Sequence, residues 1–233
     1  MRIAIVGTQN SGKSTVIKNF LEKWDMYENA SPTYRDLIKK DTKLNQLGSK
    51  ESQEMIRNSL VEQAYKNKDK KYCIHDRCIL DNLIYSLWLA DKGKIDDDQF
   101  ITETFHMTRE TLKLYDIIFI LQLDNKNPIP FEVKDTRDLD ETYRKEINEL
   151  FLAAHESYMN HEGLIFPLED CPGVIVLSGD ETKKEKTHQI ADYIDSNGDL
   201  IEPGTLMEDL ENQFAQLQKK IQDKKSKKNK SKQ

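Results

Sequence analysis

The residues best suited to chemistry follow the pattern G-x-x-x-x-G-K-S, which runs from Gly7 to Ser14. Glycines let a backbone wrap around a phosphate, so that successive N–H groups point at its oxygens. Lys13 can reach the β- and γ-phosphates of a nucleoside triphosphate, and the Ser14 hydroxyl can bind Mg²⁺. The pattern therefore predicts a nucleotide and metal site. The residues expected to form it are Gly7, Asn10, Ser11, Gly12, Lys13, Ser14 and Thr15.

This loop stands between a predicted strand and a predicted helix, which is the context it requires. Ile3–Val6 before it is a short apolar run, typical of a buried strand. After it, apolar residues recur at helical spacing, namely Val16, Ile17, Phe20, Leu21 and Trp24. The helix N-terminus would add partial positive charge beside the phosphates. A chance match in a glycine turn is the alternative, and this context argues against it.

Asp76 and Arg77 end a second predicted strand. Ligands of open α/β sheets bind beyond the carboxyl ends of strands. Asp76 could accept a proton from an attacking hydroxyl or hold a Mg²⁺-bound water, and Arg77 could pair with a phosphate through two hydrogen bonds. The alternative is an ordinary exposed ion pair at the end of a strand.

Two further arginines, Arg137 and Arg144, occur in the stretch 135–144. Arg137 lies in a predicted loop and Arg144 near the start of the following helix. Guanidinium groups at this separation could close over the phosphates and exclude water. Several acidic residues surround both arginines, so a solvated surface is an equally good interpretation.

Two turns supply the remaining candidates. Tyr34 and Arg35, after the second strand, could contact an acceptor substrate, although a plain surface turn is as good an interpretation. Ser178 and Gly179, after the last strand, could bring backbone close to a base ring.

Strands and helices alternate along the chain, which predicts repeated βαβ units and a parallel sheet. The expected strands are Ile3–Val6, Met26–Ala30, Lys71–Arg77, Asp116–Asp124 and Val174–Leu177. The longer expected helices cover about 52–67, 79–89, 96–115, 139–160 and 185–194. The continuous apolar run from Ile117 to Leu121 is typical of a strand covered on both faces.

The length of 233 residues suits one domain with an appendage, and the composition changes after Ile194. We expect a nucleotide-binding domain over 1–195 and an extension over 196–233. No apolar stretch reaches the roughly 20 residues that span a bilayer. Three cysteines cannot pair completely, so we expect reduced thiols and a cytoplasmic location.

The extension combines an apolar stripe with a basic end. An amphipathic helix is expected over about 203–221, with Leu206, Leu210, Phe214, Leu217 and Ile221 on one face. It could pack on its own domain or on a second copy in a homodimer. Eight Lys and one Asp after residue 218 contribute +7 to a net charge of −6, so residues 1–218 carry −13. Nucleic acid could therefore bind only through this tail.

Together these motifs resemble the P-loop nucleoside and nucleotide kinases. The likeness is strongest to the AAA-type ATPase and kinase-like family that includes the nicotinamide riboside kinase domain. Its members carry a similar arginine-containing lid, matched here from Thr136-Arg137 to Tyr143-Arg144. The stretch from Asp76-Arg77 through Asp81 to Tyr85 is also similar to thymidylate kinases, whose Asp-Arg pair handles the acceptor phosphate.

The resemblance implies a P-loop NTPase fold with a five-stranded sheet in the order 2-3-1-4-5. It also implies an ATP- and Mg²⁺-dependent kinase acting on a small nucleoside or nucleoside monophosphate. Lys13, Asp76, Arg77, Arg137 and Arg144 would then be catalytic, with Asp81 among the substrate contacts. A regulatory NTPase that only hydrolyses its nucleotide, and a polynucleotide end kinase, are the alternatives.

Overall fold

The structure is a computed structural model, and it describes residues 1–30, 45–123, 140–178 and 182–201. A parallel five-stranded sheet has the order β2-β3-β1-β4-β5. The strands are β1 Arg2–Val6, β2 Glu28–Asn29, β3 Cys73–Asp76, β4 Ile117–Leu121 and β5 Gly173–Leu177. The predicted α/β fold and its strand order 2-3-1-4-5 are therefore confirmed.

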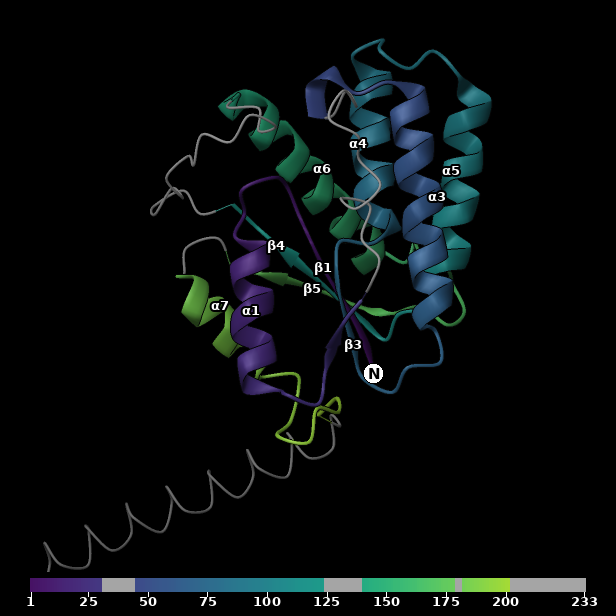
Figure 1. Cartoon of the computed structure of the whole chain (residues 1–233). Helices are drawn as coiled ribbons and strands as arrows, with labels where there is room; N and C mark the ends of the chain where they lie inside the picture. The colour runs from purple at the N-terminus through teal and green to yellow at the C-terminus, as the bar shows by residue number, and fades with distance from the viewer. Residues whose placement is uncertain (31–44, 124–139, 179–181, 202–233) are drawn as a thin grey trace, which may run out of the picture.

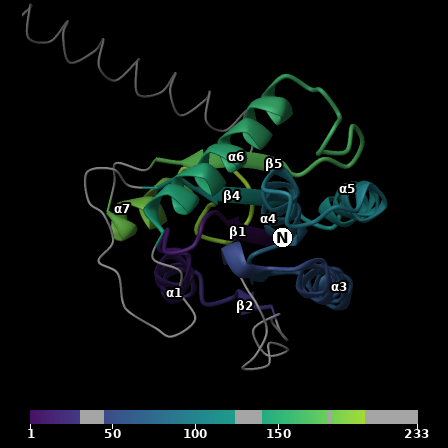
Figure 2. The same cartoon turned by 90° about the horizontal axis from the view of Figure 1, so that it is seen from above.

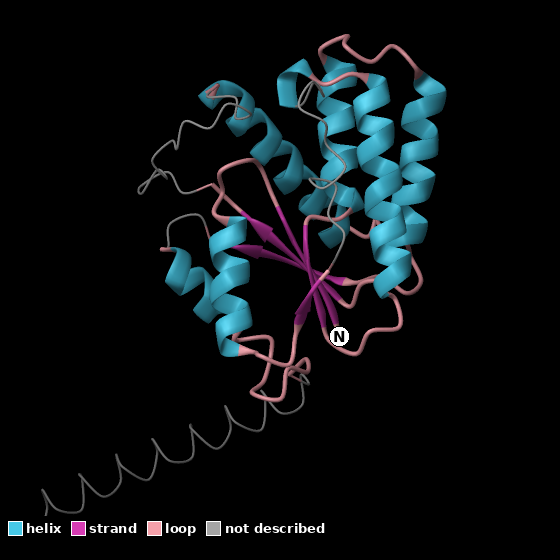
Figure 3. Cartoon of the chain, in the orientation of Figure 1, coloured by secondary structure: helices cyan, strands magenta, loops and turns pink. Residues whose placement is uncertain are grey.

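Helices cover both faces of this sheet (Figures 1 and 2). They are α1 Lys13–Lys23, α3 Lys50–Asn67, α4 Ile79–Asp91, α5 Asp98–Leu112, α6 Glu141–Met159 and α7 Lys183–Ile190, with a short 3-10 helix η1 at Asn45–Leu47. Figure 3 shows α1 and α7 together on one side of the strands, and α3, α4 and α5 grouped on the other. None of the helices in the described ranges is long and apolar enough to cross a membrane.

The alternation of side chains in β1 gives the protein two separate apolar cores. Ile3 and Ile5 pack in one cluster with residues of α1 and α7. Ala4 and Val6 point the other way, into a larger cluster with residues of α4, α5 and α6. All four side chains are fully buried, because a parallel strand in the middle of such a sheet has no solvent face.

Several boundaries differ from those expected from sequence. β3 ends at Asp76 rather than Arg77, because Arg77 turns into a positive φ of 81°. The helix predicted over 185–194 ends at Ile190, and the chain then turns so that Ile194 forms a bridge with Leu200. The helix predicted to reach about residue 115 ends at Leu112.

The turn over 195–198, where the predicted domain meets the extension, folds back against the domain. The Trp24 indole N–H donates to the Asp195 carbonyl at 2.7 Å, and the Tyr27 hydroxyl donates to the Gly198 carbonyl at 2.6 Å. This turn is therefore joined to the end of α1 and the residues before β2. The predicted helix over 203–221 and the basic tail lie outside the described residues, and the division at residue 195 stays a prediction.

Candidate active site

The phosphate loop joins β1 to α1 through backbone conformations that favour glycine. Gly7 has a φ of 137°, and a Cβ there would lie 2.7 Å from the Leu121 carbonyl oxygen in β4. Gly12, the N-cap of α1, has a φ of 92°, and Asn10 has a φ of 56°. Glycine adopts such angles readily and asparagine does so less often, whereas other residues rarely do. The residue types at these positions therefore determine the path of the loop.

Lys13 points back into this loop. Its Nζ donates to the Gly7 carbonyl at 2.8 Å and to the Thr8 carbonyl at 2.6 Å, and the side chain is buried. The first turn of α1 contains no acidic residue and receives no side-chain cap. Uncapped N–H groups beside a lysine suit an anion such as a phosphate. Ser14 is exposed at the same helix start.

Asp76 and Arg77 leave the sheet at the edge where the phosphate loop begins. Asp76 pairs with Ile5 in the register of β3 and β1, and the Arg77 N–H donates to the Ile5 carbonyl at 3.0 Å. The φ of 81° at Arg77 is unusual for a long side chain. Backbone strain of this kind occurs preferentially where function requires a particular geometry.

A buried ion pair fixes the direction of Arg77. One guanidinium nitrogen lies 2.6 Å from Asp81 Oδ1, while Asp81 Oδ2 accepts the Cys78 N–H at 3.3 Å and caps α4. Burial raises the pKa of Asp81, and the positive charges of Arg77 and Lys13 oppose that rise. Charges from both parts of the site therefore act on one carboxyl group. A direct contact of Asp81 with substrate stays a prediction.

Arg144 lies against the outside of the phosphate loop. It comes from the first turns of α6, where Nε donates to the Gln9 carbonyl at 3.3 Å and a terminal nitrogen donates to the Asn10 carbonyl at 3.4 Å. Burial lowers the pKa of Arg144, but a guanidinium stays charged at neutral pH. This cation is thus held next to the loop expected to bind phosphates.

Tyr85 belongs to the kinase-like motif noted in the sequence, but the motif assigned it no role in the site. Its hydroxyl accepts the Gln9 N–H at 3.1 Å, and its side chain is buried. Tyr85 follows Asp81 by four residues on α4, so both lie on the same helix face. The spacing of Asp81 and Tyr85 after Asp76-Arg77 points to this helix face. It does not reveal that the hydroxyl of Tyr85 contacts Gln9 in the phosphate loop.

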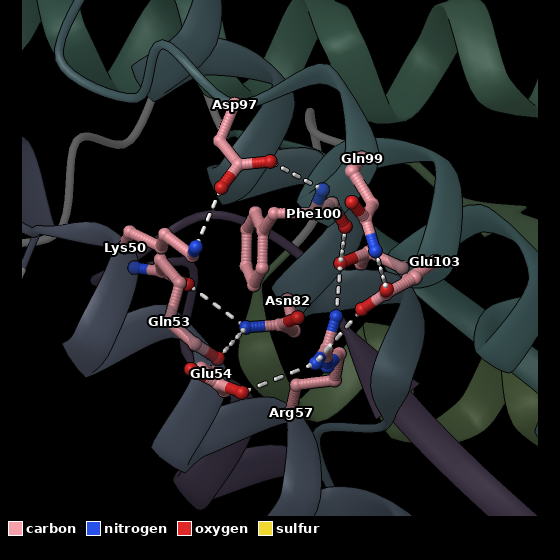
Figure 4. A network of polar contacts seen from close by, with 10 residues as sticks. Lys50, Gln53, Glu54, Arg57, Asn82, Asp97, Gln99, Phe100 and Glu103 are labelled. Atoms are coloured by element: carbon pink, nitrogen blue, oxygen red, sulfur yellow. Dashed lines mark hydrogen bonds and ion pairs between the residues drawn. The ribbon is translucent and has the colours of Figure 1, made fainter.

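A polar network behind the site holds α4 in place (Figure 4). Asn82 donates from Nδ2 to the Gln53 carbonyl at 2.8 Å and to its side-chain oxygen at 2.9 Å. On the next turn of α3, Arg57 donates to Thr104 Oγ1 of α5 at 2.9 Å. Because Asn82 directly follows Asp81, the network also restrains the helix turn that carries the buried ion pair.

Ser178 directly follows β5, and its N–H donates to Gln189 Oε1 of α7 at 3.2 Å. Its predicted place beside a base ring is not tested by this contact. The other predicted residues lie outside the described ranges and stay predictions, namely Tyr34, Arg35, Arg137 and Gly179.

Magnesium requires few protein ligands when a nucleotide supplies phosphate oxygens. Among the described residues, no group of three or more His, Cys, Asp or Glu could hold a metal by itself. Ser14 and Asp76, the predicted ligands, both lie at the edge of the sheet where the phosphate loop begins. One hydroxyl and one carboxylate are a suitable donor set for Mg²⁺ bound mainly by phosphates and water.

The sheet order and the loop around Lys13 define a P-loop nucleotide-binding protein. Residues 2–170 match the AAA domain family, and the chain belongs to that family. No curated protein matches the sequence.

Solved structures share the fold at low sequence identity. A deoxyadenosine kinase from M. mycoides, with dCMP and dCDP bound, is 20% identical with a TM-score of 0.58, covering 82% of this chain and 97% of that chain. The same kinase with dATP bound is 23% identical with a TM-score of 0.55, covering 82% and 98%. A thymidylate kinase from Candida albicans is 18% identical with a TM-score of 0.58, covering 86% and 94%. At these identities the likeness establishes the fold.

Proposed function

We propose that this chain is an ATP- and Mg²⁺-dependent kinase of a small nucleoside or nucleoside monophosphate. The observation that carries the proposal is the meeting of two groups of residues at one edge of the sheet. The phosphate loop with Lys13 lies at the end of β1, and Asp76 and Arg77 lie at the end of the adjacent β3. Phosphoryl transfer needs such a pairing of a phosphate cradle with groups for an acceptor.

The nucleotide half would bind through Lys13, the loop N–H groups and the start of α1. Ser14 and Asp76 would hold Mg²⁺, which would neutralise negative charge on the phosphates. Arg144 would stabilise charge that develops on the transferred group, and Arg137 of the predicted lid would do the same. The positive charge already fixed at the loop by Arg144 supports this assignment.

The acceptor half would use Asp76 and Arg77. Asp76 would orient or deprotonate the attacking oxygen, and Arg77 would bind a phosphate or hydroxyl of the acceptor. The ion pair with Asp81 supports this role, because it holds the guanidinium in one direction before any substrate arrives. The fold shared with a deoxyadenosine kinase and a thymidylate kinase agrees with either class of acceptor.

The deciding experiment screens acceptors with the purified full-length protein. ATP and Mg²⁺ are mixed with single nucleosides, nucleoside monophosphates or nicotinamide riboside, and ADP release is measured. The proposal expects ADP release that depends on one class of added acceptor. ATP consumption at the same rate without any acceptor would instead identify a hydrolysing NTPase.

Asp76→Asn separates the two acceptor classes. A hydroxyl acceptor needs a general base, so activity on a nucleoside should fall by about 10²- to 10⁴-fold. A phosphate acceptor is already ionised, so the variant should keep part of its activity on a monophosphate. Complete loss with a monophosphate substrate would show that Asp76 has another essential role, such as binding the metal.

A further inference from the structure

We infer that Tyr85 is a positioning residue that holds the phosphate loop in the shape required for nucleotide binding and links it to Arg77. The inference deepens the proposed function and rests on it. Tyr85 does not belong to the loop and lies 76 residues from its partner Gln9. It is an aromatic residue of α4, on the strand-to-helix unit assigned above to the acceptor.

Gln9 is held from two sides by side chains of different helices. Its N–H donates to the Tyr85 hydroxyl at 3.1 Å, and its carbonyl accepts from Arg144 Nε at 3.3 Å. The residue itself is buried. Peptide groups on both sides of the Gln9 Cα are thus fixed by contacts from outside the loop.

The two helices that hold Gln9 are packed against each other. The rings of Trp88 in α4 and Tyr143 in α6 lie 4.5 Å apart, and Tyr143 also makes an edge contact with Tyr85 at 6.3 Å. The Tyr85 hydroxyl and the Arg144 guanidinium are therefore carried on a common support. Close-packed side chains resist displacement, so a support of this kind can impose a shape on the loop.

The other side of Tyr85 meets the acceptor half. The Arg77 guanidinium carbon lies 5.7 Å from the centre of the Tyr85 ring, within the range of a cation–π contact. One side chain thus contacts both Arg77 and the phosphate loop. The contact with Arg77 keeps the Tyr85 ring in place and its hydroxyl at Gln9. Tyr85 therefore links the nucleotide half of the proposed site to the acceptor half.

Pre-organisation of this kind acts on nucleotide affinity. A loop already held in its binding shape loses less conformational freedom when phosphates arrive. Without the hydroxyl, the Gln9 N–H loses an acceptor and the loop gains alternative conformations. We expect Tyr85→Phe to weaken the binding of ADP with Mg²⁺ about tenfold, while the retained ring leaves its packing unchanged.

The experiment measures ADP binding in the presence of Mg²⁺ by isothermal titration calorimetry. Tyr115→Phe is the matched control, because Tyr115 is also buried and its hydroxyl has no hydrogen-bond partner among the described residues. Thermal unfolding of each ligand-free protein is measured alongside. The inference expects weaker ADP binding only in Tyr85→Phe, while both variants still unfold in one cooperative transition well above the temperature of the titration.

Equal ADP affinity in Tyr85→Phe and the wild type would overturn the inference. Amide hydrogen exchange of the ligand-free wild type gives a second test that needs no variant: the Gln9 amide should exchange slowly, and exchange as fast as in an open loop would also overturn it. A wild type that binds ADP but transfers no phosphoryl group contradicts only the proposed kinase. A wild type that binds no ADP contradicts both.

Discussion

The phosphate loop and the end of β3 are two halves of one candidate site, but they are built in different ways. The path of the loop follows mainly from its own glycines and from Lys13, which donates to carbonyls five and six residues earlier, and two side chains from α4 and α6 then hold it at Gln9. The end of β3 is shaped by side chains that meet across the fold. Asn82, for example, reaches Gln53 at a separation of 29 residues.

This difference suits the two tasks of the proposed site, which are binding the phosphates and recognising the acceptor. Every nucleoside triphosphate presents the same phosphates, so a short loop with fixed geometry is sufficient to bind them. Acceptors differ in size, charge and hydrogen-bonding groups, and only side chains can follow such differences. In the proposed kinase, the Asp76–Asp81 segment would therefore select the acceptor, while Gly7–Ser14 would bind the donor.

Loss of Lys13 from the phosphate loop should reduce activity more than any other change considered. In Lys13→Met we expect acceptor-dependent ADP release to fall about 10³-fold or more, because the cation that would bind the transferred phosphate disappears. Lys18→Met on the same helix is the control, since that side chain is exposed. Activity above a tenth of the wild type would mean that the loop is not the donor site.

The β3 half should depend on its buried ion pair for stability. In Asp81→Asn the Arg77 charge stays buried without its partner, so we expect unfolding free energy to fall by about 3 kcal/mol. Glu141→Gln is the matched control, because Glu141 and Lys145 form an exposed pair at the same i,i+4 spacing. It should change stability by less than about 0.5 kcal/mol. Urea denaturation measures the unfolding free energy of both variants. Equal losses would show that the buried pair contributes no more to stability than the exposed pair.

Arg144 lies outside the phosphate loop, and its substitution tests whether such a residue contributes to phosphoryl transfer. In Arg144→Met we expect kcat to fall about 10²-fold, because charge stabilisation belongs to the transition state, and the KM for ATP to rise by less, because Gln9 loses one of the contacts that hold it. Lys145→Met, an exposed neighbour on α6, should leave both constants unchanged. A raised KM with an unchanged kcat would instead assign Arg144 to ground-state binding.

The opposite end of the sheet should show the smallest effect. Burial works to raise the pKa of Asp116, but hydrogen bonds from Arg2 outweigh it and hold that pKa below its usual value. A lowered folded-state pKa means that the stabilisation is present above about pH 3.9 and is lost as pH falls through the folded-state pKa.

Asp116→Asn should therefore cost less than about 1 kcal/mol at pH 7, because the pair is partly exposed. Its difference from the wild type in urea unfolding should shrink as pH is lowered towards 3, and ADP release should be unchanged. Loss of activity would show that the two ends of the sheet are coupled.

Much of the loop half could be predicted because its determinants are local. The strand, the glycines, Lys13 and the helix follow one another within a single βα unit, and the left-handed angles at Gly7 and Gly12 suit glycine. The end of β3 was also predicted, since carboxyl ends of parallel strands lie at one edge of the sheet. The strand order needed the family resemblance, because periodicity says nothing about which strands are neighbours.

The sequence by itself therefore determined the presence of a phosphate loop, an α/β fold and an Asp-Arg pair at a strand end. Only the tertiary structure decided that Arg144 and Tyr85 meet at Gln9, over separations of 135 and 76 residues. It also decided that the pair of Arg77 and Asp81, only four residues apart, is buried by the surrounding elements. The physical reason is that helix packing, not sequence spacing, sets which side chains from distant elements come within hydrogen-bonding distance.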